Sequence, residues 1–263
     1  MSFRNTVQIL GVKVSSLNKK QVKELLLSFL DSPNQHYVVT PNPEFLVGAQ
    51  KDQEFFEILN AANLSTCDGV GLQYAAVFLG HAPPPRFTGN DLMQTLAGLC
   101  AEKGKSMYLL GGKDRVADKA ADILKGQYPT LKIRSSAGGD IGIKDRQWQM
   151  EREVLLDIRE FEPDVLFVAL GHGKQERWII SFQEFLPSVK IAAGIGGAFD
   201  YLSGSVPRAP FVLRKLGLEW LHRLFKEPRR FKRIWTAVMV FPFLVVWSKI
   251  RPRKKVESDR LKV

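Results

Sequence analysis

Hydrophobic residues follow a helical period in some parts of the chain and form short continuous runs in others. Residues 15–33 have apolar side chains at i, i+3, i+4, i+7 and i+8, which predicts an amphipathic helix with one buried face. Those side chains are Val22, Leu25, Leu26, Phe29 and Leu30. The next residues, 36–40 (HYVVT), have a short apolar run, which predicts a buried strand.

The two patterns alternate along the rest of the chain. Further strands are predicted at residues 63–67, 106–112, 131–136, 164–171 and 190–197. Helices are predicted at residues 43–50, 53–63, 71–80 and 88–104, and between each pair of the later strands. Apolar strands that alternate with helices predict a mainly parallel, Rossmann-like α/β sheet with helices on both faces. Ligands of such sheets bind beyond the carboxyl ends of the strands, so the residues after each strand are the candidates for a site.

Several predicted strands end in glycine, which allows a backbone to approach phosphate closely but is also usual in a tight turn. None of these ends fits the G-x-G-x-x-G dinucleotide fingerprint. Gly171 and Gly173 are followed by Glu176 where the third glycine is needed, and the pair at 194 and 196 is followed by Phe199. An NAD(P)-dependent enzyme on this sheet is therefore a weakly supported alternative.

Polar residues at the strand ends are the candidates for chemistry. Thr40 and Asn42 lie in a turn spaced by prolines, and Asp68 opens a helix after an apolar strand. Arg86 follows three prolines that stiffen its loop, and Gln175 begins a helix. Each of these residues alone also fits an ordinary turn, cap or surface role.

Eight sequence blocks occur together in an order and spacing that one protein family shares. They are TPNPE, DGVG, PPPRFTGND, LLGG, GHGKQE, GIGGAFDYLSG, RAP and GLEWLHRLFKEPRRFKR. In these blocks the chain resembles the WecG/TagA/CpsF glycosyltransferases, and the resemblance covers residues 7–233. One departure is Gly173, a position at which the family usually has proline.

The resemblance implies an α/β fold of the GT-E type and a sugar transfer. Enzymes of this family move a sugar, often N-acetylmannosamine, from a UDP-sugar to an acceptor sugar on a polyprenyl diphosphate. The acceptor sugar expected here is N-acetylglucosamine, the expected stereochemistry is inversion, and the products are bacterial cell-surface polymers such as teichoic acid or exopolysaccharide. Glucose and uronic acids stay open as alternative donor sugars.

Inverting transfer needs one base, which takes the proton from the attacking hydroxyl group. By resemblance that base is Asp68, and Asp200 is a weaker candidate for contact with the nucleotide. The negative charge of the leaving UDP must be met by a metal, by helix N-termini or by arginine. The chain has no D-x-D motif, and the family is metal-independent, so we expect no metal and no cofactor.

The resemblance also assigns the other strand-end residues. It implies that Thr40 and Asn42 line the sugar pocket and that Arg86 and Gln175 contact the donor.

Charge divides the chain into two parts. Residues 206–263 hold 16 Lys/Arg and 4 Asp/Glu, a net charge of +12, whereas the whole chain is +11, which leaves −1 for residues 1–205. We expect a catalytic domain at 1–205 and a basic helical appendage at 206–263. The excess charge predicts an anionic partner for the appendage, either a membrane surface or nucleic acid.

The appendage contains an apolar segment between basic clusters. Residues 234–248 are uncharged, with Trp235 and Trp247 near the ends, and Pro242 is expected to interrupt the segment. Fifteen residues are fewer than the roughly 20 that a spanning helix needs, so the segment is predicted to lie in the membrane interface. A short tilted transmembrane helix is the alternative. Nucleic-acid-binding arms are rarely so apolar between their charges, so binding to nucleic acid is not expected.

Three arginines of the appendage, Arg223, Arg230 and Arg233, match family arginines that reach the diphosphate or the membrane. They support a hypothesis in which membrane docking completes the active site. Residues 1–14 lack a secretory signal, and Cys67 and Cys100 lack metal-ligand spacing. We therefore expect a cytoplasmic protein, peripheral on the inner face of the cell membrane, with reduced thiols. A homo-oligomer is possible in this family.

Overall fold

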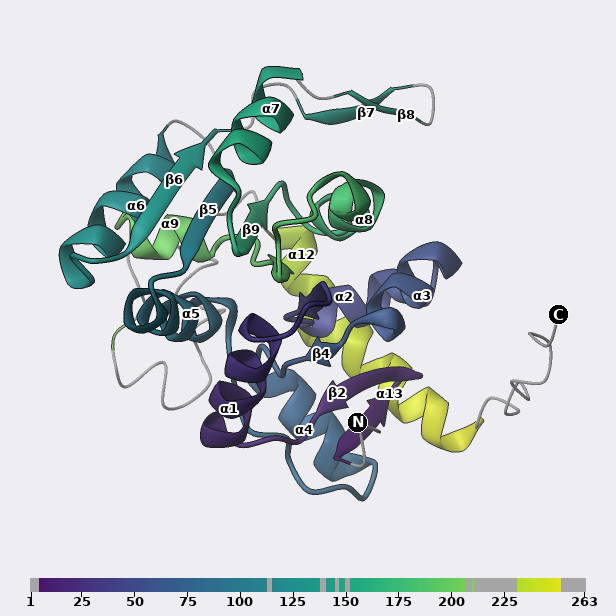
Figure 1. Ribbon diagram of the computed structural model, residues 1–263. Helices are drawn as coiled ribbons and strands as arrows, with labels where there is room; N and C mark the ends of the chain where they lie inside the picture. The colour runs from purple at the N-terminus through teal and green to yellow at the C-terminus, as the bar shows by residue number, and fades with distance from the viewer. Residues whose placement is uncertain are drawn as a thin grey trace, which may run out of the picture.

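The computed structural model describes residues 5–112, 115–137, 141–144, 147–149, 152–206, 210 and 231–251. Within them, six parallel strands form one sheet in the order β4-β3-β10-β9-β5-β6 (Figure 1). Their bounds are β3 His36–Val39, β4 Leu64–Ser65, β5 Ser106–Gly111, β6 Lys132–Ser136, β9 Val165–Ala169 and β10 Ile191–Gly194. The predicted parallel α/β sheet is confirmed.

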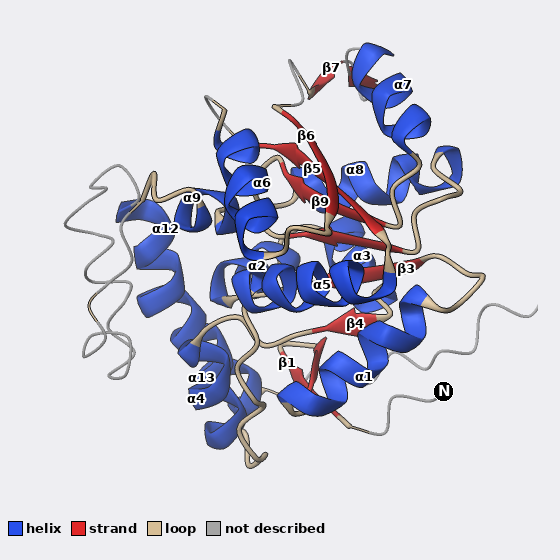
Figure 2. Cartoon of the chain, turned by 60° about the vertical axis from the view of Figure 1, so that its left-hand side comes forward, coloured by secondary structure: helices blue, strands red, loops and turns tan. Residues whose placement is uncertain are grey.

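Helices cover both faces of this sheet (Figure 2). One face packs against α1 Lys19–Leu30, α5 Gly89–Lys103, α6 Val116–Gln127 and α9 Ala198–Leu202. The other packs against α2 Pro43–Ala49, α3 Gln53–Ala61, α4 Val70–Phe78, α7 Arg152–Phe161, α8 Lys174–Phe182 and the C-terminal helix α13 Phe241–Ile250, with the short η1 Gln183–Phe185 after α8.

The central strands are apolar on both sides because both sides are covered. In β3, Val38 belongs to one core, whereas Tyr37 and Val39 belong to the other. Successive side chains of a strand point to opposite faces, so a strand buried on both faces cannot alternate apolar with polar residues. This explains why HYVVT reads as a continuous run.

The sheet has a topological switch point between β5 and β9. The chain leaves β5 for β6 on one side and leaves β9 for β10 on the other. Crevices for ligands form at the carboxyl ends of strands beside such a point. The loops that follow β3, β4, β9 and β10 all begin at the carboxyl edge of the sheet.

Two antiparallel strand pairs lie outside the sheet and were not predicted. Strands β1 Thr6–Ile9 and β2 Val12–Ser15 are joined at Leu10 and Gly11, both with positive φ. Strands β7 Gly142–Lys144 and β8 Gln147–Gln149 form the other pair. Segments of three or four residues are too short for periodicity to identify.

The C-terminal helix runs without a break from Phe231 to Ile250. The expected interruption at Pro242 is therefore wrong. It consists of α12 Phe231–Trp235, a π-helical turn Thr236–Val240 and α13. Proline lacks a donor N–H and clashes with the carbonyl four residues earlier, and the wider π turn before it accommodates both defects. The helix has 20 residues, and an 18-residue window within it has a mean hydropathy of 1.4, so by length and composition it could cross a membrane.

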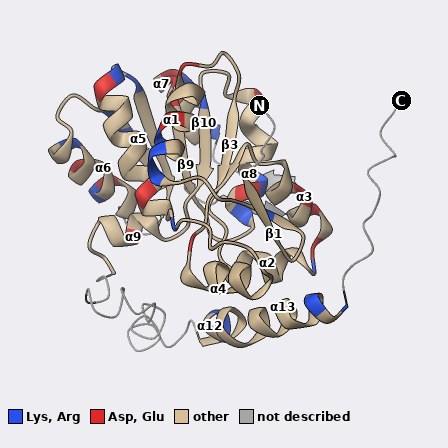
Figure 3. Cartoon of the chain, turned by 90° about the horizontal axis from the view of Figure 1, so that it is seen from below, with Lys and Arg blue, Asp and Glu red and all other residues tan. Residues whose placement is uncertain are grey.

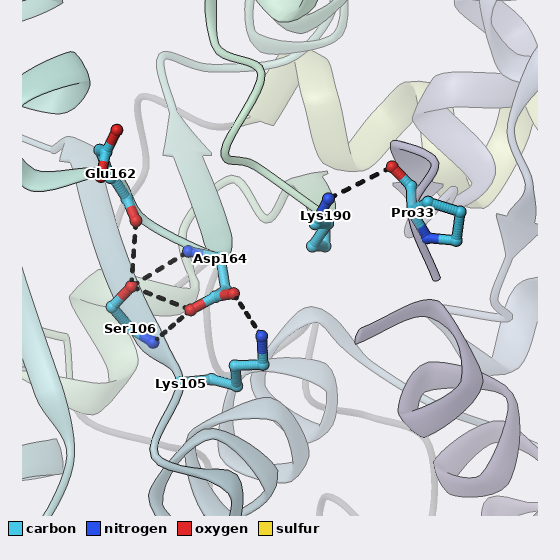
Figure 4. Close-up of polar contacts among 6 residues, drawn as sticks. All are labelled: Pro33, Lys105, Ser106, Glu162, Asp164 and Lys190. Atoms are coloured by element: carbon cyan, nitrogen blue, oxygen red, sulfur yellow. Dashed lines mark hydrogen bonds and ion pairs between the residues drawn. The ribbon is translucent and has the colours of Figure 1, made fainter. Parts of the chain in front are cut away.

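The amino edge of the sheet, opposite the loops that follow the strands, is held by a polar cluster (Figure 4). The Asp164 carboxylate accepts hydrogen bonds from the Ser106 backbone N–H and from Lys105 Nζ, each at 2.9 Å. Burial opposes ionisation of Asp164, but these bonds outweigh it and hold its pKa below the ordinary value. Nearby, Lys190 Nζ donates to the carbonyl oxygen of Pro33 at 3.2 Å.

We expect Asp164→Ala to lower the free energy of unfolding by about 1–3 kcal/mol, because it leaves a part-buried backbone N–H and an ammonium without their acceptor. A carboxylate with a lowered pKa stabilises the fold above its unfolded pKa, so the difference from wild type should shrink as pH falls below about 4. Urea unfolding of both proteins at several pH values measures this difference in the free energy of unfolding. Equal stability at neutral pH would contradict the assigned role.

Candidate active site at the carboxyl edge of the sheet

Asp68 and Arg86 lie together after strand β4. Asp68 N–H donates to the carbonyl oxygen of Pro41 at 3.0 Å, and its Oδ2 accepts from Gly89 N–H, the first residue of α5, at 3.3 Å. Arg86 forms an isolated parallel bridge with Cys67. Burial first, and then the charge of Asp68, raise the Cys67 pKa to about 12 although Arg86 lowers it, so both charges lie close to a thiol that stays protonated.

Thr40 and Asn42 stand at the end of β3. The buried Thr40 hydroxyl donates to the carbonyl oxygen of Gly194 at 3.3 Å. Asn42 is the N-cap of α2, and its Oδ1 accepts from the backbone N–H groups of Glu44 and Phe45 at 2.9 and 3.2 Å. The cap uses the amide oxygen and leaves the amide NH₂ as a donor.

Gln175 lies in the first turn of α8, and its side-chain amide contacts the residues at the end of β10. Its Oε1 accepts from Gly196 N–H at 3.1 Å, and its Nε2 donates to Glu176 Oε1 at 2.7 Å. Glu176 Oε2 in turn accepts from Gly173 N–H at 2.8 Å. A Cβ at Gly194 would lie 2.6 Å from both Gln175 Nε2 and Glu176 Oε1, so this approach requires glycine.

These contacts bring the candidates into one region. Thr40 and Gln175 both meet Gly194, the last residue of β10. A Cβ at Gly89 would lie 3.3 Å from the carbonyl oxygen of Ile195, so the helix start that binds Asp68 also touches the end of β10. A carboxylate, a hydroxyl, amides and a guanidinium therefore surround the carboxyl ends of β3, β4 and β10, an arrangement suited to proton abstraction beside a bound anion.

Comparison with known proteins identifies the chain. Residues 7–255 match the glycosyl transferase WecG/TagA/CpsF family. The chain belongs to this family. A protein of Bacillus subtilis strain 168 is 32% identical over 82% of this chain and 85% of its own length. A protein of Staphylococcus aureus strain MRSA252 is 29% identical over 94% of this chain and 95% of its own. Both are named N-acetylglucosaminyldiphosphoundecaprenol N-acetyl-beta-D-mannosaminyltransferase.

Glu176 is a buried residue of this site that the sequence alone did not select as a site residue. It is fully buried, and burial raises its pKa to about 7 even though hydrogen bonds from Gln175 and the backbone lower it. It fixes the orientation of the Gln175 amide. Its place directly after Gln175 and near a strand-end glycine was the only signal.

Because its pKa is raised, Glu176 binds a proton more tightly in the folded chain than in the unfolded chain. We therefore expect the free energy of unfolding to fall, by on the order of 3 kcal/mol, as pH rises from about 4.5 to about 7. Glu176→Gln cannot titrate, so urea unfolding of this variant should lack that component. Wild-type and variant curves that run parallel across this range would contradict the assignment.

Position 173 carries the departure from the family pattern. Gly173 has φ 77°, which a proline ring, fixed near −65°, cannot adopt. Its N–H also donates to Glu176, and proline has no N–H. In this chain glycine and Glu176 together begin α8, so a relative with proline here needs a different local backbone.

The appendage reaches the edge of the site through Arg233. Its Nε donates to Glu44 Oε2 at 2.7 Å, and Glu44 lies in the first turn of α2, next to Asn42. Glu44 was visible in the TPNPE block but was not selected as a site residue. Asp200 lies in α9, after β10, with Ser203 Oγ donating to its carbonyl oxygen at 3.2 Å. Arg223 and Arg230 lie outside the described residues.

Within the described part of the chain, no three His, Cys, Asp or Glu residues gather into a set that could hold a metal ion. The expected metal independence and the roles of the site residues stay predictions.

Proposed function

We propose that this glycosyltransferase moves N-acetylmannosamine from a UDP-sugar to N-acetylglucosamine on a polyprenyl diphosphate, with inversion. The observation that carries the proposal is the placement of Asp68 beside the segment that bears Arg86, which bridges Cys67 at the carboxyl edge of the sheet. The chain also covers nearly the full length of relatives named for this transfer. The product of this reaction would serve the synthesis of a cell-surface polymer such as teichoic acid.

In the proposed reaction Asp68 takes the proton from the acceptor hydroxyl group. The oxygen forms a bond to the anomeric carbon of the donor sugar while the bond from that carbon to the diphosphate breaks, and UDP leaves with the electron pair. Attack from the face opposite UDP inverts the configuration. Only one carboxylate is needed for this step, and Asp68 is the one proposed.

In this proposal, Arg86 and helix N-termini stabilise the negative charge on the leaving UDP, and no metal takes part. Helices α5 and α8 begin at this edge, and an N-terminus favours anions. Thr40 and the Asn42 amide would hold the sugar, and Gln175 would shape the donor site through its bond to Gly196. Asp200 is kept as a contact for the nucleotide.

The appendage is proposed to hold the enzyme on the cytoplasmic face of the cell membrane. Phe241 and Val245 are only 2% and 3% exposed because they pack into the core beneath α13. A helix held along one side by the domain can lie in the interface but would have to detach in order to span. Arg223, Arg230 and Arg233 would then meet the diphosphate or lipid head groups, which couples activity to docking.

The test is UDP release from UDP-N-acetylmannosamine, UDP-N-acetylglucosamine, UDP-glucose and UDP-glucuronic acid, with a lipid-diphosphate N-acetylglucosamine analogue in detergent, with and without EDTA. We expect acceptor-dependent release with the first donor, unchanged by EDTA. Release with another donor alone would change the substrate. No release with any donor would overturn the proposal.

A further inference from the structure

The C-terminal helix is apolar on its outer side as well as on the side that meets the core. In α13 the large apolar side chains that are exposed are spaced at i, i+3, i+4 and i+7, one helical face, and they are Phe243, Val246, Trp247 and Ile250. Earlier in the same helix, Trp235 and Met239 are about half exposed. A surface helix of a soluble protein is normally polar on this side.

Helix α4 of the catalytic domain has the same property. Tyr74, Val77 and Phe78 are 67%, 55% and 44% exposed, and their spacing of i, i+3 and i+4 places them on one face. The opposite face, with Leu72, Ala75 and Ala76, is buried in the core. Within the described residues, no element covers the outer face of α4.

Two contacts set α4 and α13 side by side and in the same direction (Figure 2; Figure 3). At one end, a Cβ at Gly71 would lie 3.9 Å from Phe241 Cε1. At the other, Lys249 Nζ donates to the Phe78 carbonyl oxygen at 2.6 Å and lies 4.5 Å from the centre of the Phe78 ring. The two exposed apolar faces therefore adjoin.

Basic groups border these faces and acidic groups are absent from both segments. Lys249 reaches across to α4, and the Arg251 guanidinium lies 4.8 Å from the centre of a Trp247 ring. Residues 69–90 and 231–251 contain no Asp or Glu. Apolar and aromatic side chains edged by Lys and Arg match the acyl and head-group regions of an anionic bilayer.

We propose that Tyr74, Val77 and Phe78 of α4 and Phe243, Val246 and Trp247 of α13, together the α4–α13 surface, dock on an anionic lipid bilayer. The catalytic domain itself would thus supply half of the membrane contact. This inference rests on the proposed function, and it adds an orientation. Helix α4 begins at Val70, two residues after Asp68, so insertion of its face would bring the proposed base to the membrane surface where a lipid-linked acceptor lies.

A second copy of the chain fits this surface less well. A symmetric dimer would bring the same patch of each copy together, so that Lys249 and Arg251 of both copies would lie in one interface. The tail that contains them has 16 Lys/Arg against 4 Asp/Glu, so such a contact brings like charges together, whereas anionic lipid neutralises them.

The experiment compares two double variants of the full chain by flotation with vesicles of phosphatidylcholine, with and without phosphatidylglycerol. Tyr74→Gln/Val77→Gln changes α4 and leaves α13 intact. Ile123→Gln/Leu156→Gln is the matched control, because these side chains are also exposed, at 36% and 49%, but lie on α6 and α7. Glutamine keeps helix propensity in both.

We expect the α4 variant to lose at least about tenfold in partitioning to anionic vesicles, and the control less than about twofold. UDP release with a water-soluble acceptor should be unchanged in both. If wild type floats and the α4 variant floats equally well, the inference is overturned and the proposed function stands. A dimer that the α4 variant dissociates without a change in flotation would also overturn it, with a second copy as the occupant. If wild type does not float, the membrane part of the proposed function fails as well.

Discussion

Replacement of Asp68 by Asn is expected to lower kcat by about 10²–10⁴-fold while the affinity for UDP stays within about twofold. Asparagine keeps the shape of the side chain and an oxygen that can accept the Gly89 N–H bond, now 3.3 Å long, but it cannot take a proton. The loss should therefore appear in turnover and not in folding. UDP release measures kcat, and a thermal shift with UDP measures binding.

The neighbouring carboxylate Asp91 supplies the matched control. It lies in the first turn of α5, the helix whose first residue binds Asp68, but its Oδ2 accepts from the backbone N–H and hydroxyl of Thr88 as a cap. Asp91→Asn should reduce stability by about 1 kcal/mol and leave kcat within about threefold. Wild-type turnover in Asp68→Asn, or an equal loss in both variants, would remove Asp68 as the base.

The parallel sheet could be predicted because its signal is carried by many residues at once. Val38 and its neighbours Tyr37 and Val39 are all apolar since both faces are covered, and the same holds for β5, β9 and β10. The position of the site followed from this topology alone, since the loops that hold Thr40, Asp68 and Gln175 must share one edge.

Features that depend on a single contact could not be predicted in this way. Nothing in the sequence shows that Glu176 is fully buried beside Gly194. The two residues come together only because α8 packs across the end of β10. The continuous helix through Pro242 could not be predicted either. A local π turn removes the clash because of which proline was expected to break the helix. Local strain and long-range pairing are decided by tertiary packing, which one-dimensional periodicity does not contain.

Phe241→Ala is expected to release the C-terminal helix from the domain. The ring is 2% exposed and approaches Gly71 of α4, and removal of a buried aromatic ring costs about 3–5 kcal/mol. Because the sheet and its flanking helices have a core of their own, the helix should detach while the domain stays folded. Hydrogen exchange should show loss of protection over residues 231–250 and not in β3, β5 or β9.

Phe243→Ala separates docking of the helix on the domain from docking on lipid. This ring lies two residues further on and is 63% exposed, so its removal should change stability by less than about 0.5 kcal/mol and leave exchange protection intact. It should still reduce partitioning to anionic vesicles.

Phe241→Ala should lower turnover with the lipid-linked acceptor by at least about tenfold, because the released helix no longer holds Arg233 against Glu44 or aligns α4 with the bilayer. If the Phe241 variant keeps both protection and turnover, the helix is not coupled to the site, and membrane docking serves only to raise the local concentration of enzyme.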